Sequence, residues 1–248
     1  MIEGKDMIQL PTEPVKASTA NPKLFVIYSP PKAGKTSLLA KLEGNLIIDL
    51  ENGSDYVDAL KVKANNLEEL KQIGKAIWEA KKPYKYVTID TVTALEGMCE
   101  LRALELYKAT PMGKNYTGTS VLDLPQGGGY LYLRLAYKEW LDKLKTLADH
   151  IILVGHLKDK FLTDKKGVDV QAKDLDLTGK IKNITCADSD AIGYLYREGD
   201  KVFINFESSD EVTCGARPAH LKGQRIHVAD YNRETNDMTA YWDRIYVN

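Results

Sequence analysis

The chain of 248 residues has few cysteines and no long apolar run. Its three cysteines, Cys99, Cys186 and Cys214, are an odd number at wide spacings, with no C-x-x-C pair and no nearby histidine cluster. This pattern does not fit a disulfide framework or a zinc site, and it predicts reduced thiols in a cytoplasmic protein. No apolar run approaches the ~20 residues of a membrane-spanning helix, and the N-terminus lacks the basic and apolar parts of a signal peptide. We therefore expect no membrane partner.

The chain also lacks a charge excess of either sign. Its 34 Lys and Arg residues nearly balance 35 Asp and Glu residues, which excludes the global basic field of many nucleic-acid-binding proteins. Any contact with DNA must then come from a local patch. The length suits one large α/β domain, and we expect a flexible N-terminal arm at 1–21, a core at 22–213 and a C-terminal extension at 214–248.

One stretch, residues 24–39, predicts a buried strand, a tight loop and a helix. The segment S-P-P-K-A-G-K-T at 29–36 places a Gly-Lys-Thr triplet between the strand and the helix, where a P-loop binds ATP with Mg²⁺. The usual P-loop opens with glycine, whereas this one opens with Ser29. The alternative is a chance Gly-Lys-Thr in a surface turn. The residues expected to bind the nucleotide are Ser29, Pro30, Pro31, Lys32, Ala33, Gly34, Lys35, Thr36 and Ser37.

Strands and helices alternate after this loop. Apolar runs predict strands at 45–50, 84–90 and 151–155, and helical spacing of apolar residues predicts helices at 66–82, 91–107 and 130–148. Alternating elements of this kind form a mainly parallel twisted sheet flanked by helices. A β-hairpin is expected at 189–206, and two polar stretches, 109–129 and 157–184, are expected to be long loops.

Acidic residues follow two of the predicted strands. Since ligands of open α/β sheets bind at the carboxyl ends of strands, Asp90 is expected to hold Mg²⁺ together with the Thr36 hydroxyl. Glu51 is expected to position the water that attacks the γ-phosphate. Asp49 competes for this role, because strand alternation points Asp49 and Glu51 to the same side. The alternatives are a helix-capping role for Asp90 and a solvated turn for Glu51.

A histidine and two arginines complete the candidate catalytic set. His156 follows the strand at 151–155 and is placed to sense the γ-phosphate, although a lone histidine is often structural. The core offers no arginine near its own phosphate loop, and a neighbouring subunit is a common source of such a cation. Arg197 and Arg217 are the candidates, and we favour Arg217 because glycine and proline fix a turn around it.

The two long loops carry the candidate DNA-binding residues. Cations and aromatic side chains mixed in one loop can contact phosphates and stack on bases, although a lysine-rich run is usually only a solvated loop. The second loop has a local excess of only two lysines over aspartates. The residues expected to contact DNA are Lys114, Tyr116, Lys158, Lys160, Lys165 and Lys166.

Together, these motifs resemble the RecA-like ATPase core, and most of all the small phage nucleotide-binding proteins that act in single-strand annealing or strand exchange. The resemblance covers about residues 23–206 and depends on the P-loop, Glu51, Asp90, His156 and the late hairpin. It implies that Glu51 is the catalytic base, that His156 senses the γ-phosphate and that both long loops face single-stranded DNA. It also implies a homo-oligomeric ring or filament, a single-strand DNA-binding protein as a further partner, and a phage-encoded protein in a bacterial host.

Two other functions remain open at this stage. A monomeric P-loop kinase acting on a small molecule would need an arginine-rich lid, whereas residues 108–182 contain only Arg134, with Arg102 nearby. A non-catalytic nucleotide-binding loader or regulator of replication would have a P-loop but would not need Glu51.

Overall fold

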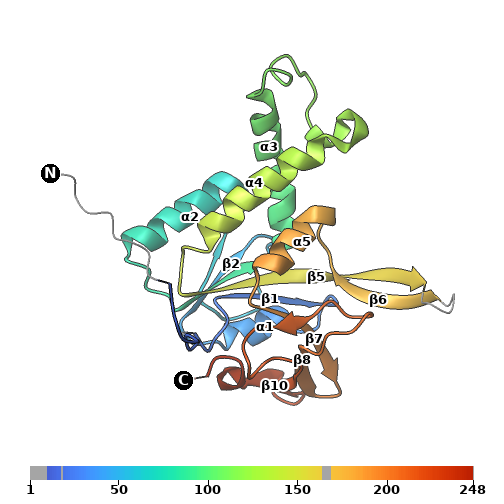
Figure 1. Ribbon diagram of the computed structural model, residues 1–248. Coiled ribbons are helices and arrows are strands. Elements are labelled where there is room, and N and C mark those ends of the chain that lie inside the picture. The colour runs from blue at the N-terminus through green and yellow to red at the C-terminus, as the bar shows by residue number, and fades with distance from the viewer. Residues whose placement is uncertain (1–9, 18, 164–168, 248) are drawn as a thin grey trace.

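The computed structural model describes residues 10–17, 19–163 and 169–247, and between 160 and 171 only the backbone is considered. One mixed sheet runs through the molecule, with strand order β11-β10-β8-β7-β1-β5-β4-β2-β3 and two further strands, β6 and β9, attached to it. Figure 1 shows the helices α2, α3, α4 and α5 gathered on one side of this sheet. The strands are β1 (Leu24–Ser29), β2 (Asn45–Asp49), β3 (Lys61–Lys63), β4 (Tyr86–Asp90), β5 (His150–Thr163), β6 (Asp169–Leu175), β7 (Ala191–Glu198), β8 (Lys201–Asn205), β9 (Gly215–Ala216), β10 (Arg225–Asn232) and β11 (Asp237–Ala240).

The centre of the sheet is parallel. β1 lies between β5 and β7 and is parallel to both, while β4 pairs in parallel with β5 and β2. All six residues of β1 are buried, which agrees with a strand covered on both faces. The predicted α/β fold with a mainly parallel sheet is confirmed. Because the strands run the same way, the segments that follow β1, β2, β4 and β7 all leave the sheet at one edge.

The two faces of the sheet pack against different elements. Val26 and Tyr28 belong to a core shared with α2, α3 and α4, whereas Phe25 and Ile27 pack with α1 and the C-terminal segment. This alternation follows from the two-residue period of a strand. The helices are α1 (Lys35–Ala40), α2 (Leu67–Glu79), α3 (Val92–Lys108), α4 (Gly129–Leu144) and α5 (Gly179–Asp188), and the 3₁₀ turns are Val121–Asp123, Pro125–Gly127 and Trp242–Arg244.

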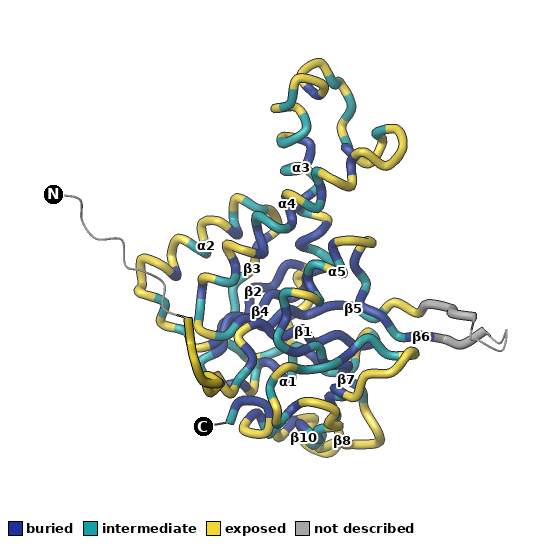
Figure 2. The backbone as a smooth tube through the Cα atoms, in the orientation of Figure 1, coloured by how far each residue is buried: buried dark blue, intermediate teal, exposed yellow. Residues whose placement is uncertain are grey.

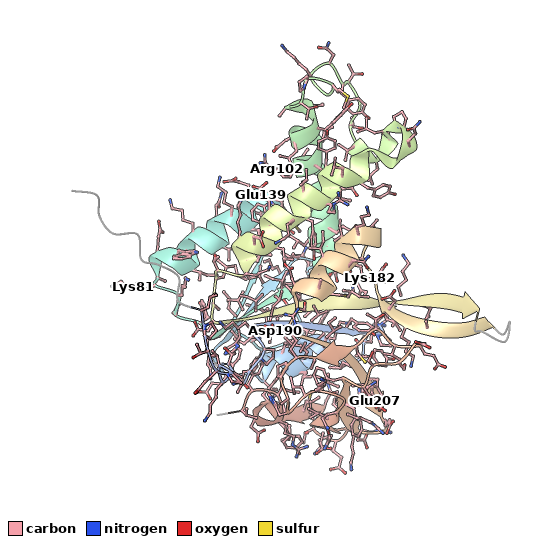
Figure 3. The ribbon with its side chains drawn as sticks, viewed as in Figure 1. Lys81, Arg102, Glu139, Lys182, Asp190 and Glu207 are labelled. Carbon is pink, nitrogen blue, oxygen red and sulfur yellow. The ribbon has the colours of Figure 1, made fainter. Side chains whose placement is uncertain are left out.

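Local signals predicted the helix starts well. The Asn66 side chain caps α2 by accepting a hydrogen bond from the amide of Glu69, and Thr91 caps α3 by accepting one from Ala94. Beyond the body of the molecule, α3 and α4 project together with residues 109–128, which join them (Figure 1). Figure 3 labels Arg102 of α3 and Glu139 of α4, whose Nε and Oε2 atoms are 3.1 Å apart. None of the helices in the described ranges is long and apolar enough to cross a membrane.

The expectation of a long loop at 157–184 was wrong. β5 continues past the parallel sheet to Thr163 and pairs with β6 in an antiparallel hairpin, and α5 follows. The hairpin leaves the body of the molecule as a separate projection in Figure 1. Its sequence is rich in Lys and Asp, which are depleted in strands, but pairing with a partner strand satisfies the backbone regardless of these side chains.

The C-terminal extension adds strands to the same sheet. β10 pairs with β8, and β11 pairs with β10, all antiparallel. After β11 in the sequence, the indole Nε1 of Trp242 donates a hydrogen bond to the Leu38 carbonyl at 2.9 Å. Both residues are buried, so the C-terminal segment packs directly on α1, the helix that follows the phosphate loop. Figure 2 shows α1 and the C-terminal strands together in the lower part of the molecule.

Candidate functional site

The P-loop leaves the carboxyl end of β1 and enters α1. Gly34 adopts a φ of 92° at the N-terminal end of α1, a conformation that glycine tolerates and other residues rarely adopt. The buried Lys35 extends back along the loop, where its Nζ donates to Ser29 Oγ at 2.9 Å and to the Pro30 carbonyl at 3.4 Å. Burial lowers the pKa of Lys35, and nearby Asp90 and Glu51 oppose this effect. Negative phosphates would compensate this buried cation.

Thr36 and Asp90 meet across the sheet edge as the sequence predicts. The Thr36 hydroxyl donates a hydrogen bond to Asp90 Oδ2 at 2.8 Å. Burial raises the pKa of Asp90, while the bond from Thr36 and the charge of Lys35 lower it. Carboxylate and hydroxyl oxygens suit Mg²⁺. Within the described ranges there is no group of three or more His, Cys, Asp or Glu side chains that could hold a metal, so Mg²⁺ would depend on nucleotide oxygens as well.

Glu51 is held from two sides. The Thr91 hydroxyl donates to Glu51 Oε1 at 2.6 Å, and His156 Nε2 lies 2.9 Å and 3.1 Å from the two carboxylate oxygens. The Glu51 side chain remains 35% exposed, so a water molecule can reach it. The other ring nitrogen of His156, Nδ1, is buried without a hydrogen-bond partner in the structure. This arrangement suits a carboxylate that orients water, and that role stays a prediction.

Asp49 has a different environment from Glu51. It is 2% exposed, and Oδ2 accepts hydrogen bonds from the amide and hydroxyl of Ser54 at 2.9 Å and 2.6 Å. Oδ1 accepts from the amides of Glu51 and Gly53. Burial raises the pKa of Asp49, but these hydrogen bonds outweigh it and the pKa is lowered. Asp49 therefore stabilises the turn after β2, and both of its carboxylate oxygens already accept hydrogen bonds within that turn.

From the sequence alone, Thr91 was not selected at this edge, and Arg197 was not expected to lie near the phosphate loop. Thr91 positions Glu51, and its place directly after Asp90 at a helix start was the available signal. The expectation that no arginine lies near the phosphate loop was wrong, because Arg197 lines the same cavity as Lys32 and Gly34. β7 is parallel to β1, so the carboxyl end of β7 carries Arg197 to the P-loop edge.

Arg217 lies at the opposite edge of the sheet. Its guanidinium donates to Asp190 Oδ1 at 3.1 Å and to the Ala187 carbonyl at 2.6 Å. Asp190, labelled in Figure 3, also accepts from the amides of Lys23 and Leu24, where β1 begins. Arg217 is therefore remote from the P-loop of its own chain, and a role in a neighbouring subunit stays a prediction.

The predicted DNA-binding residues fall on two separate projections. Lys114 is exposed in the segment between α3 and α4, whereas the Tyr116 hydroxyl is bound to the Ser120 carbonyl at 2.8 Å. Lys158 lies in β5 at the start of the hairpin and faces Asp176 at 3.2 Å. The Lys160 side chain, Lys165 and Lys166 lie outside the described residues. The structure thus does not bring the described members of this set together.

A cleft between α4 and α5 carries cations that sequence reasoning did not select. It has a volume of about 590 Å³ and is lined by Tyr130, Arg134 and Lys180, together with small and apolar residues and no acidic residue. Tyr130 is half-exposed, and neither Arg134 nor Lys180 has an ion-pair partner among the described side chains. Such a cleft suits a ligand that carries negative charge and an aromatic or apolar part.

Comparison with known proteins assigns the chain to a family. The model of the AAA domain family matches residues 21–218, which include the P-loop, Glu51, Asp90 and His156. No curated protein matches the chain. Among solved structures, the crystal structure of the RadB recombinase is similar, with 12% sequence identity and a TM-score of 0.48 over 89% of this chain and 92% of that one. The matched residues form a P-loop nucleotide-binding domain, and the chain belongs to the AAA domain family.

Proposed function

We propose that the protein is a Mg²⁺-dependent ATPase. The observation that carries the proposal is the convergence, at one sheet edge, of a P-loop, the Thr36–Asp90 pair and a carboxylate held by Thr91 and His156. Lys35 and the loop amides would bind the phosphates. Thr36 and Asp90 would hold Mg²⁺, which supplies charge neutralisation for the transferred phosphate. Glu51 would orient the attacking water and accept its proton.

His156 links this site to the hairpin of β5 and β6 through its contacts. Its ring contacts Glu51, and its carbonyl accepts a hydrogen bond from the Asp176 amide at 3.0 Å, where the hairpin of β5 and β6 closes. A γ-phosphate that attracts His156 or Glu51 would alter their mutual contact and thereby the start of the hairpin. This link supports a γ-phosphate sensor role for His156.

Turnover of ATP tests the proposal directly. We expect the purified protein to release phosphate from ATP only with Mg²⁺, and single-stranded DNA to raise the rate. Absence of turnover with intact Mg²⁺-dependent ATP binding would instead indicate a nucleotide-binding regulator.

The proposal extends to single-stranded DNA, with annealing or recombination as the outcome and a homo-oligomeric ring or filament as the active form. Two observations support a DNA contact. One is the cleft lined by Tyr130, Arg134 and Lys180, which has no acidic lining residue, and the other is the lysine-bearing hairpin of β5 and β6, whose pairing starts directly after His156. Aromatic stacking with cationic contacts to phosphates is typical of single-strand binding. The earlier candidates Lys114, Tyr116, Lys158, Lys160, Lys165 and Lys166 belong to the same proposal, as do a single-strand DNA-binding protein as partner and a phage origin.

Replacing both cleft cations, Arg134→Ala with Lys180→Ala, is expected to weaken single-stranded DNA binding. Each lost phosphate contact lowers the slope of log affinity against log salt by about 0.7, so the double variant should lose about 1.4. Fluorescence anisotropy at several salt concentrations measures this slope. The control, Lys71→Ala with Lys75→Ala, removes the same charge from the exposed face of α2. Equal slopes in the two double variants would contradict a DNA contact in the cleft.

Arg217 belongs to the proposal as a cation supplied to a neighbouring subunit. Since Arg217 is remote from its own P-loop, Arg217→Ala should retain ATP binding and lose most turnover. Mixing this variant with excess Lys35→Ala protein should restore some activity at mixed interfaces. Unrestored activity, together with a monomeric mass in the presence of ATP and DNA, would count against a shared site.

A further inference from the structure

A second cavity lies against the P-loop on the side away from Glu51. It has a volume of about 390 Å³, and its walls include Lys32, Gly34 and Ser37 of the loop and the start of α1. Glu51, Asp90 and His156 are not among its lining residues, so it does not belong to the edge where water would attack. Small-molecule pockets commonly measure ~300–1,000 Å³. A molecule bound in this cavity would lie directly beside phosphates bound in the loop.

The facing wall comes from the end of β7 and from the hairpin of β10 and β11. A hydrogen-bonded sheet and an ion pair fix its position: β10 pairs with β8, and Lys41 Nζ of the segment after α1 lies 2.7 Å from Asp237 Oδ1. Met238 approaches the loop so closely that a Cβ on Gly34 would lie 3.3 Å from its terminal methyl carbon. This contact makes the hairpin a fixed wall of the cavity.

Aromatic and cationic side chains line this cavity. The Arg197 guanidinium lies 4.5 Å from the centre of the Tyr231 ring, which is close enough for a cation–π contact. Tyr56, from the turn after β2, also lines the cavity and is fully exposed, so no protein group covers its ring. Asn236 lines the cavity beside Tyr231, and a side-chain amide can donate to an acceptor on a bound molecule. A planar heteroaromatic ring with hydrogen-bond acceptors fits these groups.

We propose that this cavity binds the nucleoside part of the nucleotide, with Tyr56 stacking on the base and the Arg197–Tyr231 pair forming the opposite wall. The proposal rests on ATP binding at the P-loop, as argued above. Tyr231 and Asn236 lie beyond residue 218, where the match to the AAA domain model ends. The C-terminal segment would therefore complete the nucleoside site with Tyr231 and Asn236, while the matched domain supplies Tyr56, Arg197 and the phosphate site.

The affinities for ATP and for inorganic tripolyphosphate, which lacks the nucleoside, distinguish the nucleoside part of the site from the phosphate part. Wild-type protein is expected to bind ATP more tightly than tripolyphosphate. Tyr56→Ala and Arg197→Met should each weaken ATP binding about tenfold, as expected for the loss of one stacking or cation–π contact of about 1.4 kcal/mol. Binding of tripolyphosphate should stay within about twofold of wild type. Calorimetry in the presence of Mg²⁺ measures all these affinities.

Further variants guard against effects on folding. Tyr56→Ala alters a fully exposed side chain, so its result does not depend on core packing. Tyr231→Phe keeps the ring and should bind ATP within about twofold to threefold of wild type, whereas Tyr231→Leu should resemble Arg197→Met. Wild-type ATP affinity in both Tyr56→Ala and Arg197→Met would overturn the proposal, and so would an equal loss of ATP and tripolyphosphate. Wild-type protein that binds neither ligand would overturn the proposed ATPase function as well.

Discussion

Lys35→Ala is expected to abolish ATP turnover and to weaken ATP binding while the protein stays folded. Among the described residues, the buried Nζ of Lys35 donates hydrogen bonds to Ser29 at the end of β1 and to the Pro30 carbonyl, so its removal loses hydrogen bonds only within the local segment 29–35. Burial lowers the pKa of Lys35, which indicates that the charge is held there at a cost in solvation. Loss of one preorganised donor at a transition-state charge reduces a rate by ~10²–10³. We therefore expect at least a ~10²-fold loss.

Phosphate release and calorimetry measure the two effects, and thermal unfolding checks the fold. Lys23→Ala is a matched control, because Lys23 is an exposed lysine directly before β1, at the edge opposite the P-loop. It should retain wild-type turnover. Wild-type ATP affinity in Lys35→Ala would mean that the loop at 29–36 does not bind phosphates, and both the ATPase proposal and the nucleoside pocket would be abandoned.

Local sequence signals were enough to place most of the candidate site. The P-loop was recognisable because a buried strand precedes Gly34 and apolar helix residues follow it. Thr36 and Asp90 could be paired because two parallel strands end at the same edge, and their 2.8 Å hydrogen bond agrees with that reasoning. The caps Asn66 and Thr91 mark helix starts through contacts within three residues, so no knowledge of the tertiary structure was needed.

Contacts between distant segments could not be derived in the same way. Arg197 reaches the P-loop edge because β7 pairs with β1, and the hairpin wall reaches Gly34 through Met238, which is over 200 residues away. Asp49 and Glu51 were not separated, since strand alternation holds only while the chain stays extended. β2 ends at Asp49, and the following turn directs Asp49 inward and Glu51 toward His156.

The second large effect is expected from replacing Glu51, one of the two acidic residues at the end of β2. Glu51→Gln should keep ATP affinity within about twofold of wild type and slow hydrolysis by about 10²-fold or more, the contribution typical of a general base. Glutamine has the same length and can still accept a hydrogen bond from Thr91, so the geometry around His156 is largely retained. What it loses is the negative charge that would accept a proton from water. Single-turnover phosphate release measures the chemical step.

Asp49→Asn is the matched control, because it removes the same charge two residues away. Asp49 accepts four hydrogen bonds within the turn, and its pKa is lowered because the folded turn favours the charged form. An amide can satisfy only part of this set, and a hydrogen bond to a charged group contributes ~1.5–3 kcal/mol. Asp49→Asn should therefore lower the unfolding free energy by about 2 kcal/mol and leave turnover per folded molecule within a few-fold of wild type. If Asp49→Asn instead stops hydrolysis without unfolding, and Glu51→Gln does not, Asp49 is the catalytic base and the interpretation of this edge is reversed.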